Sequence, residues 1–373
     1  MRNRFLATLS ALALVLVLAA CDGGVMNKPQ STGEAAEKPS FNWRLASVWG
    51  DGTFQFEGDR RFAETVTKLS GGRLTITAYG AGAIVPTTGV FDAVRNATVE
   101  CGGDWPSYWT GFNTAFDLLG SQVLGFNNYD YMNWIYGAGG LAFYKELYGK
   151  YGMEYFPVAM SGMESGIRST KRVTRLDDLA GMKIRFAGLI QGELIQKFGV
   201  TPVSMSLPEA YEGLQRGVID AMEFSAPIND EAAKLQEVAK YWLAPGWHQT
   251  CSVYGVMINK DAYNKLDDEL KLIIEKAAKS VGIETMAEYG WGDSVATNKM
   301  IDYGVEVNWL SEEDLDRLEA AKNDVMAKLS RENPDYAKVA KAQMQYFRDY
   351  DRYRTFLGGW SFGRTPKVYP DLP

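Results

Sequence analysis

Histidine is nearly absent from this chain, because His248 is the only one among 373 residues. Metal centres built from several histidines are therefore excluded, and a Ser-His-Asp or Cys-His mechanism could use only that residue. Basic residues are also in deficit, with 39 Lys and Arg against 46 Asp and Glu and a net charge of −7. This balance argues against nucleic acid as a partner, because such binding depends mainly on neutralising phosphates.

The apolar run near the N-terminus is too short to span a bilayer. Arg2 and Arg4 precede it, and it covers residues 5–20. A short apolar run behind positive charges is typical of a secretory signal, so we predict a signal peptide at 1–20. Residues 18–21, LAAC, resemble the cleavage site of bacterial lipoproteins, which predicts that Cys21 is acylated; ordinary signal cleavage is the alternative.

The segment 21–40 has almost nothing to bury and is rich in Gly, Ser, Pro, Lys and Glu. Such a composition predicts a flexible tether between the lipid on Cys21 and the folded body. In a Gram-negative cell, Asp22 directly after the lipidated cysteine resembles the signal for retention on the inner membrane. We therefore expect a protein anchored on the periplasmic side of the cytoplasmic membrane.

Cysteine is scarce as well, with three in the chain. If Cys21 carries the lipid, Cys101 and Cys251 remain. An oxidising compartment permits these two to pair, and the sequence leaves a disulfide between them open.

The body of the chain, from Phe41 onward, alternates strand and helix patterns. One series covers about 41–103 and a second about 176–224, which predicts an α/β fold with mainly parallel sheets. Residues 91–100 and 211–220 echo one another in residue type, which favours two similar lobes. Such lobes usually place a ligand in the cleft beyond the carboxyl ends of their strands. Long amphipathic helices are predicted downstream, at 266–286 and 312–329.

Arg185 is the strongest candidate for binding an anion. It ends the alternating strand pattern GMKIRF at 181–186 and precedes a predicted helix at 189–198. A guanidinium beside a helix N-terminus suits a carboxylate, which it can bind through two parallel hydrogen bonds. A solvated arginine at the strand edge is the alternative. The segment 188–192 lacks the Lys and Ser or Thr of a P-loop.

Other candidate residues follow two further strands. Glu223 and Phe224 end a predicted strand, where a carboxylate beside an aromatic ring could bind a cation or act as an acid. Glu223 could also pair with Glu164 as the two carboxylates of a glycosidase, which defines the alternative of a secreted carbohydrate-active enzyme. His248 and Gln249 lie in a Gly/Pro turn and could hydrogen-bond a small polar ligand, although a lone histidine is more often structural.

Several of these motifs together resemble a known family. The chain has SGGRL at 70–74, VFDAV at 90–94, GMKIR at 181–185, LQRGVIDA at 214–221 and PGWH at 245–248. In this order they resemble the solute-binding proteins of tripartite ATP-independent periplasmic (TRAP) transporters, with the greatest likeness to the subgroup that binds 2-oxoacids and lactate.

The resemblance implies a two-lobed periplasmic-binding-protein fold with an interlobe cleft and long C-terminal helices. It implies a non-enzymatic receptor that closes on a small organic acid, such as a 2-oxoacid, lactate or a similar monocarboxylate, and delivers it to the TRAP membrane permease. The expected divisions are lobe 1 at 41–164 plus 253–305, lobe 2 at 165–252 plus 306–345, and a C-terminal helix end and tail at 346–373. Some subgroup members dimerise through a C-terminal helix, so a homodimer is left open.

The same resemblance assigns roles to single residues. It implies that Arg185 binds the ligand carboxylate, that Glu223 lies at a metal and ligand site, and that Phe224 stands where tryptophan is usual. Tyr108 falls on the aromatic stretch that lines the first lobe.

Two positions depart from the subgroup pattern. Met163 replaces a glutamine, and Gln249 replaces a metal-binding glutamate. A bridging sodium or calcium ion needs several oxygen ligands, and the metal site would here rest on Glu223 and Gln249. Unless another acid such as Glu164 contributes, we expect ligand binding that needs a cation weakly or not at all.

Overall fold

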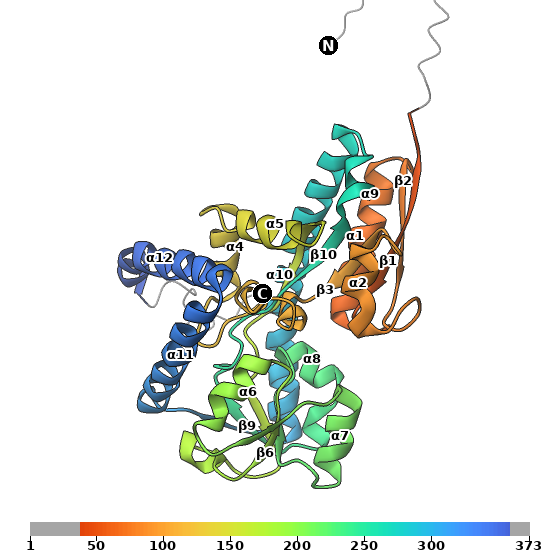
Figure 1. Ribbon diagram of the computed structural model, residues 1–373. Helices are drawn as coiled ribbons and strands as arrows, with labels where there is room; N and C mark the ends of the chain where they lie inside the picture. Colours follow the sequence, from red (N-terminus) through yellow and green to blue (C-terminus); the bar gives the residue numbers. More distant parts are fainter. Residues whose placement is uncertain (1–37, 359–373) are drawn as a thin grey trace, which may run out of the picture. The chain divides into compact units, whose positions relative to one another are not determined.

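The computed structural model describes residues 38–358 (Figure 1). All of the described helices and strands lie in the compact unit that begins at Ser40. The predicted signal at 1–20, Cys21, most of the tether and the tail from 359 onward lie outside the described residues. Among the described helices, none is both long and apolar enough to cross a membrane.

The first sheet has five strands in the order β2-β1-β3-β10-β4. Their bounds are β1 Phe41–Ser47, β2 Leu74–Tyr79, β3 Cys101–Asp104, β4 Met153–Met160 and β10 Val253–Asn259. The strands β1, β2 and β3 are parallel, whereas β10 runs antiparallel to both of its neighbours.

The second sheet has six strands in the order β11-β9-β5-β8-β6-β7. Their bounds are β5 Ile167–Ser169, β6 Lys183–Arg185, β7 Thr201–Val203, β8 Ala221–Met222, β9 Tyr241–Ala244 and β11 Glu306–Trp309. Here β5 is the strand that runs antiparallel to its neighbours, while the other pairs are parallel.

In each sheet one strand, β10 or β5, runs against the others, and the remaining strands share one direction, so the prediction of mainly parallel sheets is confirmed. The reversed strands follow two of the three segments that carry the chain between the sheets, 161–166 and 245–252; the third such segment contains the helix α10 (Asp268–Tyr303) and leads from β10 to β11. The strand β5 follows the first crossing and β10 follows the second. Each enters its new sheet from the edge where the parallel strands end, so it must run against them. The alternation of strands and helices in the sequence carries no signal for this reversal.

Twelve α-helices are described around the two sheets. They are α1 Phe54–Leu69, α2 Val90–Arg95, α3 Ala115–Gly120, α4 Asn128–Tyr136, α5 Leu141–Gly149, α6 Leu189–Gln196, α7 Leu207–Gln215, α8 Pro227–Ala232, α9 Lys260–Asn264, α10 Asp268–Tyr303, α11 Glu312–Glu332 and α12 Pro334–Leu357. The helix predicted at 266–286 corresponds to α10, which is longer than the prediction and has 36 residues. It contacts β4 and α1 beside the first sheet and α8 beside the second (Figure 1).

Local sequence signals explain the main elements. Thr53 begins α1, because its hydroxyl accepts a hydrogen bond from the Phe56 amide at 3.2 Å. Phe62 and Val66, one turn apart, bury the same face of α1 against the first sheet and α10. A separate core lies on the second sheet, where Ile184 and Leu243 are buried. Each sheet thus has its own hydrophobic core.

Cys101 and Cys251 are both buried and both free in this structure. Cys101 belongs to β3, whereas Cys251 lies in the second crossing segment, where its thiol contacts the carbonyl of Ser161 at 3.4 Å. The pairing that the sequence left open is not formed.

Candidate functional site

Arg185 and Glu223 lie side by side where two neighbouring strands of the second sheet end. Arg185 ends β6 and Glu223 follows β8, and these strands pair in parallel. The Arg185 Nη1 donates to the Glu223 carboxylate at 3.0 Å and to its carbonyl at 2.7 Å, while Nε donates to the Met205 carbonyl at 3.2 Å. The strand register thus fixes a buried guanidinium against a buried carboxylate.

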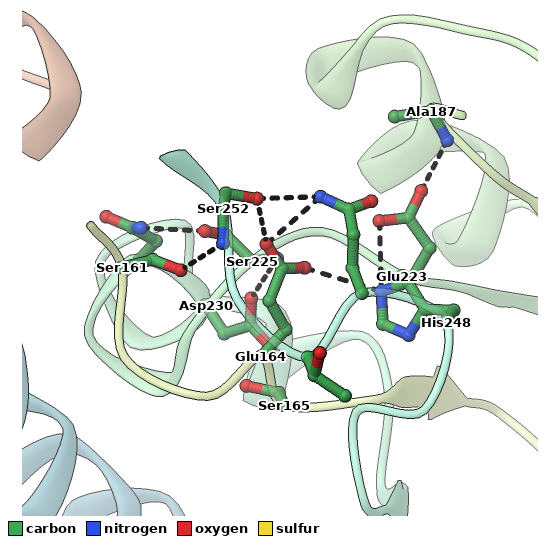
Figure 2. Close-up of polar contacts among 12 residues, drawn as sticks. Ser161, Glu164, Ser165, Ala187, Glu223, Ser225, Asp230, His248 and Ser252 are labelled. Carbon is green, nitrogen blue, oxygen red and sulfur yellow. Dashed lines mark hydrogen bonds and ion pairs between the residues drawn. The ribbon is translucent and has the colours of Figure 1, made fainter. Parts of the chain in front are cut away.

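The loop between β6 and α6 also holds this carboxylate. The backbone amide of Ala187 donates to Glu223 Oε1 (Figure 2). Burial alone would raise the pKa of Glu223, but the charges of Arg185 and His248 and the Ala187 amide bring it below its usual value. Glu223 is therefore an anion, and its second oxygen has no hydrogen-bond partner among the described residues.

The two crossing segments bring three more polar residues to this point. Glu164 comes from the first crossing, and His248 and Gln249 come from the second. The His248 Nε2 lies 3.4 Å from Glu164 Oε2 and 3.5 Å from Glu223 Oε2, and all three side chains are at most 3% exposed (Figure 2). The crossing segments thus complete a site that begins at the ends of β6 and β8.

Opposing effects set the charges of Glu164 and His248. Burial raises the pKa of Glu164 to about 7, although the nearby imidazole acts against it. Burial would lower the pKa of His248, but the two carboxylates outweigh it and raise that pKa to about 9. At neutral pH the imidazole is therefore protonated and lies between the two acids.

Gln249 fixes one end of Glu164. Its Nε2 donates to Glu164 Oε1 at 3.2 Å and to the Ser252 hydroxyl at 2.8 Å, and that hydroxyl donates to the same carboxylate oxygen at 2.9 Å. With its amide nitrogen engaged, the Gln249 carbonyl oxygen is left without a described partner. Three buried oxygens, one each from Glu164, Glu223 and Gln249, thus lack a hydrogen-bond partner among the described residues, and the two carboxylate oxygens lie 3.4 and 3.5 Å from His248 Nε2.

A cation fits this set of atoms. One ligand atom each from Glu164, Glu223 and His248 lies within 4.8 Å of the others. Carboxylate and amide oxygens are the ligands that sodium and calcium prefer. Glu164 meets the condition that the sequence analysis left open, because it adds a second carboxylate beside Glu223, and the strength of the cation requirement stays a prediction.

The other predicted residues lie at varied distances from this cluster. Tyr108 contacts the rings of Trp49 and Trp105, with centroids 5.7 and 5.1 Å away. Desolvation raises the pKa of the Tyr108 hydroxyl to about 12, and the charge of Arg185 acts against this rise. Met163 is 46% exposed, and its neighbour Glu164 is the residue buried in the cluster.

Sequence reasoning undervalued two members of the site. The sequence offers Glu164 as a glycosidase carboxylate and as an additional acid for the cation, and it leaves His248 open between a ligand contact and a structural role. Glu164 lies between the two strand series and His248 follows the second, so no local pattern marks either residue as a member of the site.

Comparison with known proteins agrees with this geometry. The model of the bacterial extracellular solute-binding protein family 7 matches residues 45–333. The chain belongs to this family. A periplasmic protein of Nostoc sp. named as binding monocarboxylate 2-oxoacids is 28% identical over 87% of this chain and 86% of its own length.

Solved structures of TRAP transporter solute-binding proteins share the fold. A TRAP transporter solute-binding protein of Bordetella bronchiseptica is 27% identical with a TM-score of 0.80, covering 86% of this chain and 95% of that one. It is a dimer with copurified calcium and picolinate in one site and an apo second site. A protein of Pseudoalteromonas atlantica, 26% identical with a TM-score of 0.79 over 85% and 97% of the two chains, holds sodium and pyruvate. As a family 7 member, the chain is an extracytoplasmic solute-binding receptor of the TRAP type, as its sequence motifs predict.

Proposed function

We propose that this receptor captures a small monocarboxylate, such as a 2-oxoacid or lactate, together with a cation, and passes it to a TRAP permease in the membrane. The observation that carries the proposal is the pair of buried carboxylates, Glu164 and Glu223, each with one oxygen that lacks a hydrogen-bond partner among the described residues, together with the guanidinium of Arg185 against Glu223. An organic acid would complete this site by giving its carboxylate to Arg185 and its neighbouring oxygen to the cation.

Charge balance supports a cation in the proposed complex. With Glu164 ionised, two carboxylates face one guanidinium and one imidazolium, so a ligand carboxylate would add an uncompensated negative charge to a buried site. Burying an unpaired charge is costly, and a bound sodium or calcium ion would offset it. Glu164, Glu223 and Gln249 would hold this ion through their free oxygens.

We infer that the two carboxylates bind rather than catalyse. Both free oxygens face the same imidazole nitrogen, and Gln249 and Ser252 engage the other oxygen of Glu164. The family and the named relatives are receptors, and they give no support to the glycosidase alternative. Incubation with a panel of aryl glycosides should release no aglycone.

The proposal also covers the site of action. We propose that Cys21 carries a lipid that holds the receptor on the periplasmic side of the cytoplasmic membrane, beside the permease. Replacing Cys21 by Ser should move the protein from the detergent phase to the aqueous phase of a Triton X-114 separation. The Bordetella protein forms a dimer in its structure, and we propose that this receptor forms a homodimer as well. Sedimentation analysis can measure its oligomeric state.

The ligand itself gives the decisive experiment. Protein purified without added organic acids should release a monocarboxylate on denaturation, identified by mass spectrometry. Calorimetry on protein stripped of ligand and re-equilibrated with sodium and calcium should then show one site per chain for pyruvate or lactate. Saturable binding of a hexuronate, with no response to any monocarboxylate at millimolar concentration, would refute the proposed ligand class.

A further inference from the structure

Asp293 is a half-buried residue in the second half of α10, and its carboxylate contacts two separate segments of the chain. Its Oδ1 accepts the backbone amide of Ile228 at 2.9 Å, at the start of α8. Its Oδ2 lies against Gly162, because a Cβ at that glycine would overlap this oxygen. One side chain of α10 thus contacts both the first crossing segment and the beginning of α8.

The two segments that Asp293 contacts are the ones that carry the carboxylates of the site. Gly162 shortly precedes Glu164 in the first crossing segment, and Ile228 shortly follows Glu223. Asp293 therefore fixes a point close to each carboxylate, although neither glutamate is its hydrogen-bond partner. A shift of its side chain would move both segments.

The same two segments are also joined by their own backbones. The Ser165 amide donates to the Ser225 carbonyl at 2.9 Å. Ser165 directly follows Glu164, and Ser225 shortly follows Glu223. The segments are thus held at two places, once through this backbone bond and once through Asp293, and Glu164 lies between the two places in the chain.

Both contacts of Asp293 are specific to the residues that make them. The atoms nearest to a Cβ at position 162 all belong to Asp293, so glycine is needed there to let the carboxylate approach. On α8, the Asn229 amide donates to the Tyr289 hydroxyl at 3.2 Å, one turn before Asp293 on α10. The start of α8 is therefore fixed to α10 next to the Ile228 contact.

The placement of the two carboxylates matters because a cation accepts little error in its ligands. Calcium needs oxygen ligands at about 2.3–2.6 Å, so the free oxygens of Glu164 and Glu223 must keep a defined separation. Partners that orient metal ligands without touching the metal typically change metal affinity by about 10–100-fold. A residue that holds both carboxylate segments belongs to this class.

We propose that Asp293 is a positioning residue for the cation site, which sets the separation of Glu164 and Glu223 by holding the segments that carry them. It acts on the ion through these two residues and does not contact it. The inference rests on the proposed function, since it concerns the cation that the two carboxylates bind there. It makes a residue of α10, outside the carboxylate cluster, a determinant of cation affinity.

Terbium is the probe for the full-length protein freed of cations, because this ion takes the oxygen ligands that calcium takes. Trp247, buried and directly before His248, can excite its luminescence, and lifetimes in H2O and D2O count the water molecules on the ion. Asp293→Ala should weaken terbium binding about tenfold and admit more water to the ion. Asp293→Asn keeps an oxygen for the Ile228 amide and should bind terbium within about threefold of the parent.

Gly162→Ala tests the same contact from the other segment. The added methyl group would overlap Asp293 Oδ2, so terbium binding should weaken by a similar factor. Combined with Asp293→Ala the overlap is gone, and the loss in the double variant should be clearly smaller than the two single losses together.

Asp267→Ala is the matched control. The Asp267 carboxylate accepts the Leu270 amide at 2.9 Å at the start of the same helix, about 40 Å from Asp293 along α10. Its replacement removes a helix cap, so it should lower Tm and leave the terbium affinity and lifetime unchanged.

The outcomes separate this inference from the proposed function. A folded Asp293→Ala protein with the terbium affinity and lifetime of the parent would overturn the positioning role, as would losses that add fully in the double variant. If Asp293→Ala does not fold, an unchanged terbium affinity in Gly162→Ala would overturn it instead. A parent protein that binds no terbium would overturn the proposed cation site and this inference with it.

Discussion

Replacing Arg185 by Ala should abolish most ligand binding and also destabilise the protein. The side chain is 7% exposed and donates to the Glu223 carboxylate, the Glu223 carbonyl and the Met205 carbonyl. Its removal leaves a buried carboxylate without its guanidinium, a change that typically costs about 3–5 kcal/mol of folding stability. The lost contact to the ligand should cost about 2–5 kcal/mol, which is about 30-fold to about 4,000-fold in Kd.

A second buried pair provides the matched control. Arg168 donates to Asp230 at 2.7 Å and stacks over Trp242, with its guanidinium carbon 3.7 Å from the ring centroid. Arg168→Ala should therefore lower Tm to a similar extent while changing Kd by less than about threefold, because stability and binding are separate measurements. Arg185→Lys should restore only part of the affinity, since an ammonium cannot form the planar pair of hydrogen bonds.

Calorimetry and thermal unfolding together test whether Arg185 binds the ligand carboxylate. Both arginine variants should unfold cooperatively at lower temperature, and only the variants at position 185 should lose ligand. A folded Arg185→Ala protein that binds pyruvate or lactate as tightly as the parent would refute the assignment of the carboxylate site.

Three further predictions concern the cation, pH and closure. Removing cations with a chelator should weaken ligand binding by the parent protein about tenfold or more. Glu164→Gln should reduce this dependence on cations, because it removes one of the two carboxylates. A parent protein whose ligand affinity is unchanged by the chelator would contradict the cation site. Burial raises the pKa of Asp117 to about 8, so the folded state retains a proton that the unfolded state releases. The contribution of this proton to the free energy of unfolding is complete below about pH 4 and is lost by about pH 8, at up to about 1.4 kcal/mol per pH unit. In chemical denaturation, Asp117→Asn should therefore flatten the decrease in stability between these pH values. The exposed Asp302→Asn should leave that decrease unchanged. Ligand should reduce the radius of gyration in small-angle scattering, because Tyr108 precedes the first crossing and Arg185 belongs to the second sheet; an unchanged radius at saturation would argue against closure.

The sequence was most informative where a residue's role depends on its place in a local pattern. Arg185 and Glu223 end predicted strands, and parallel neighbours bring such ends together. Glu164 and His248 belong to segments whose course depends on how the two sheets are joined. No local period carries that information, so their meeting at 3.4 Å could be found only in three dimensions.

The same limit explains the strand directions. Alternating strands and helices predict parallel neighbours, and the pattern holds within each series of units. It fails at β5 and β10, which enter from the other sheet. The apolar run of β10 is compatible with either direction, because a strand buried on both faces looks the same in sequence whichever way it runs.

The position of β10 late in the sequence affects how fast this protein folds. The strand lies between β3 and β4 in the first sheet, and its residue Met257 pairs with Gly102, which is far away in the sequence. The first sheet therefore cannot close until most of the chain, including every strand of the second sheet except β11, is available. Contacts of such long sequence separation make folding slow. A chain that folds slowly stays unfolded long enough to be threaded through a membrane, which is the step that the predicted signal at 1–20 would require.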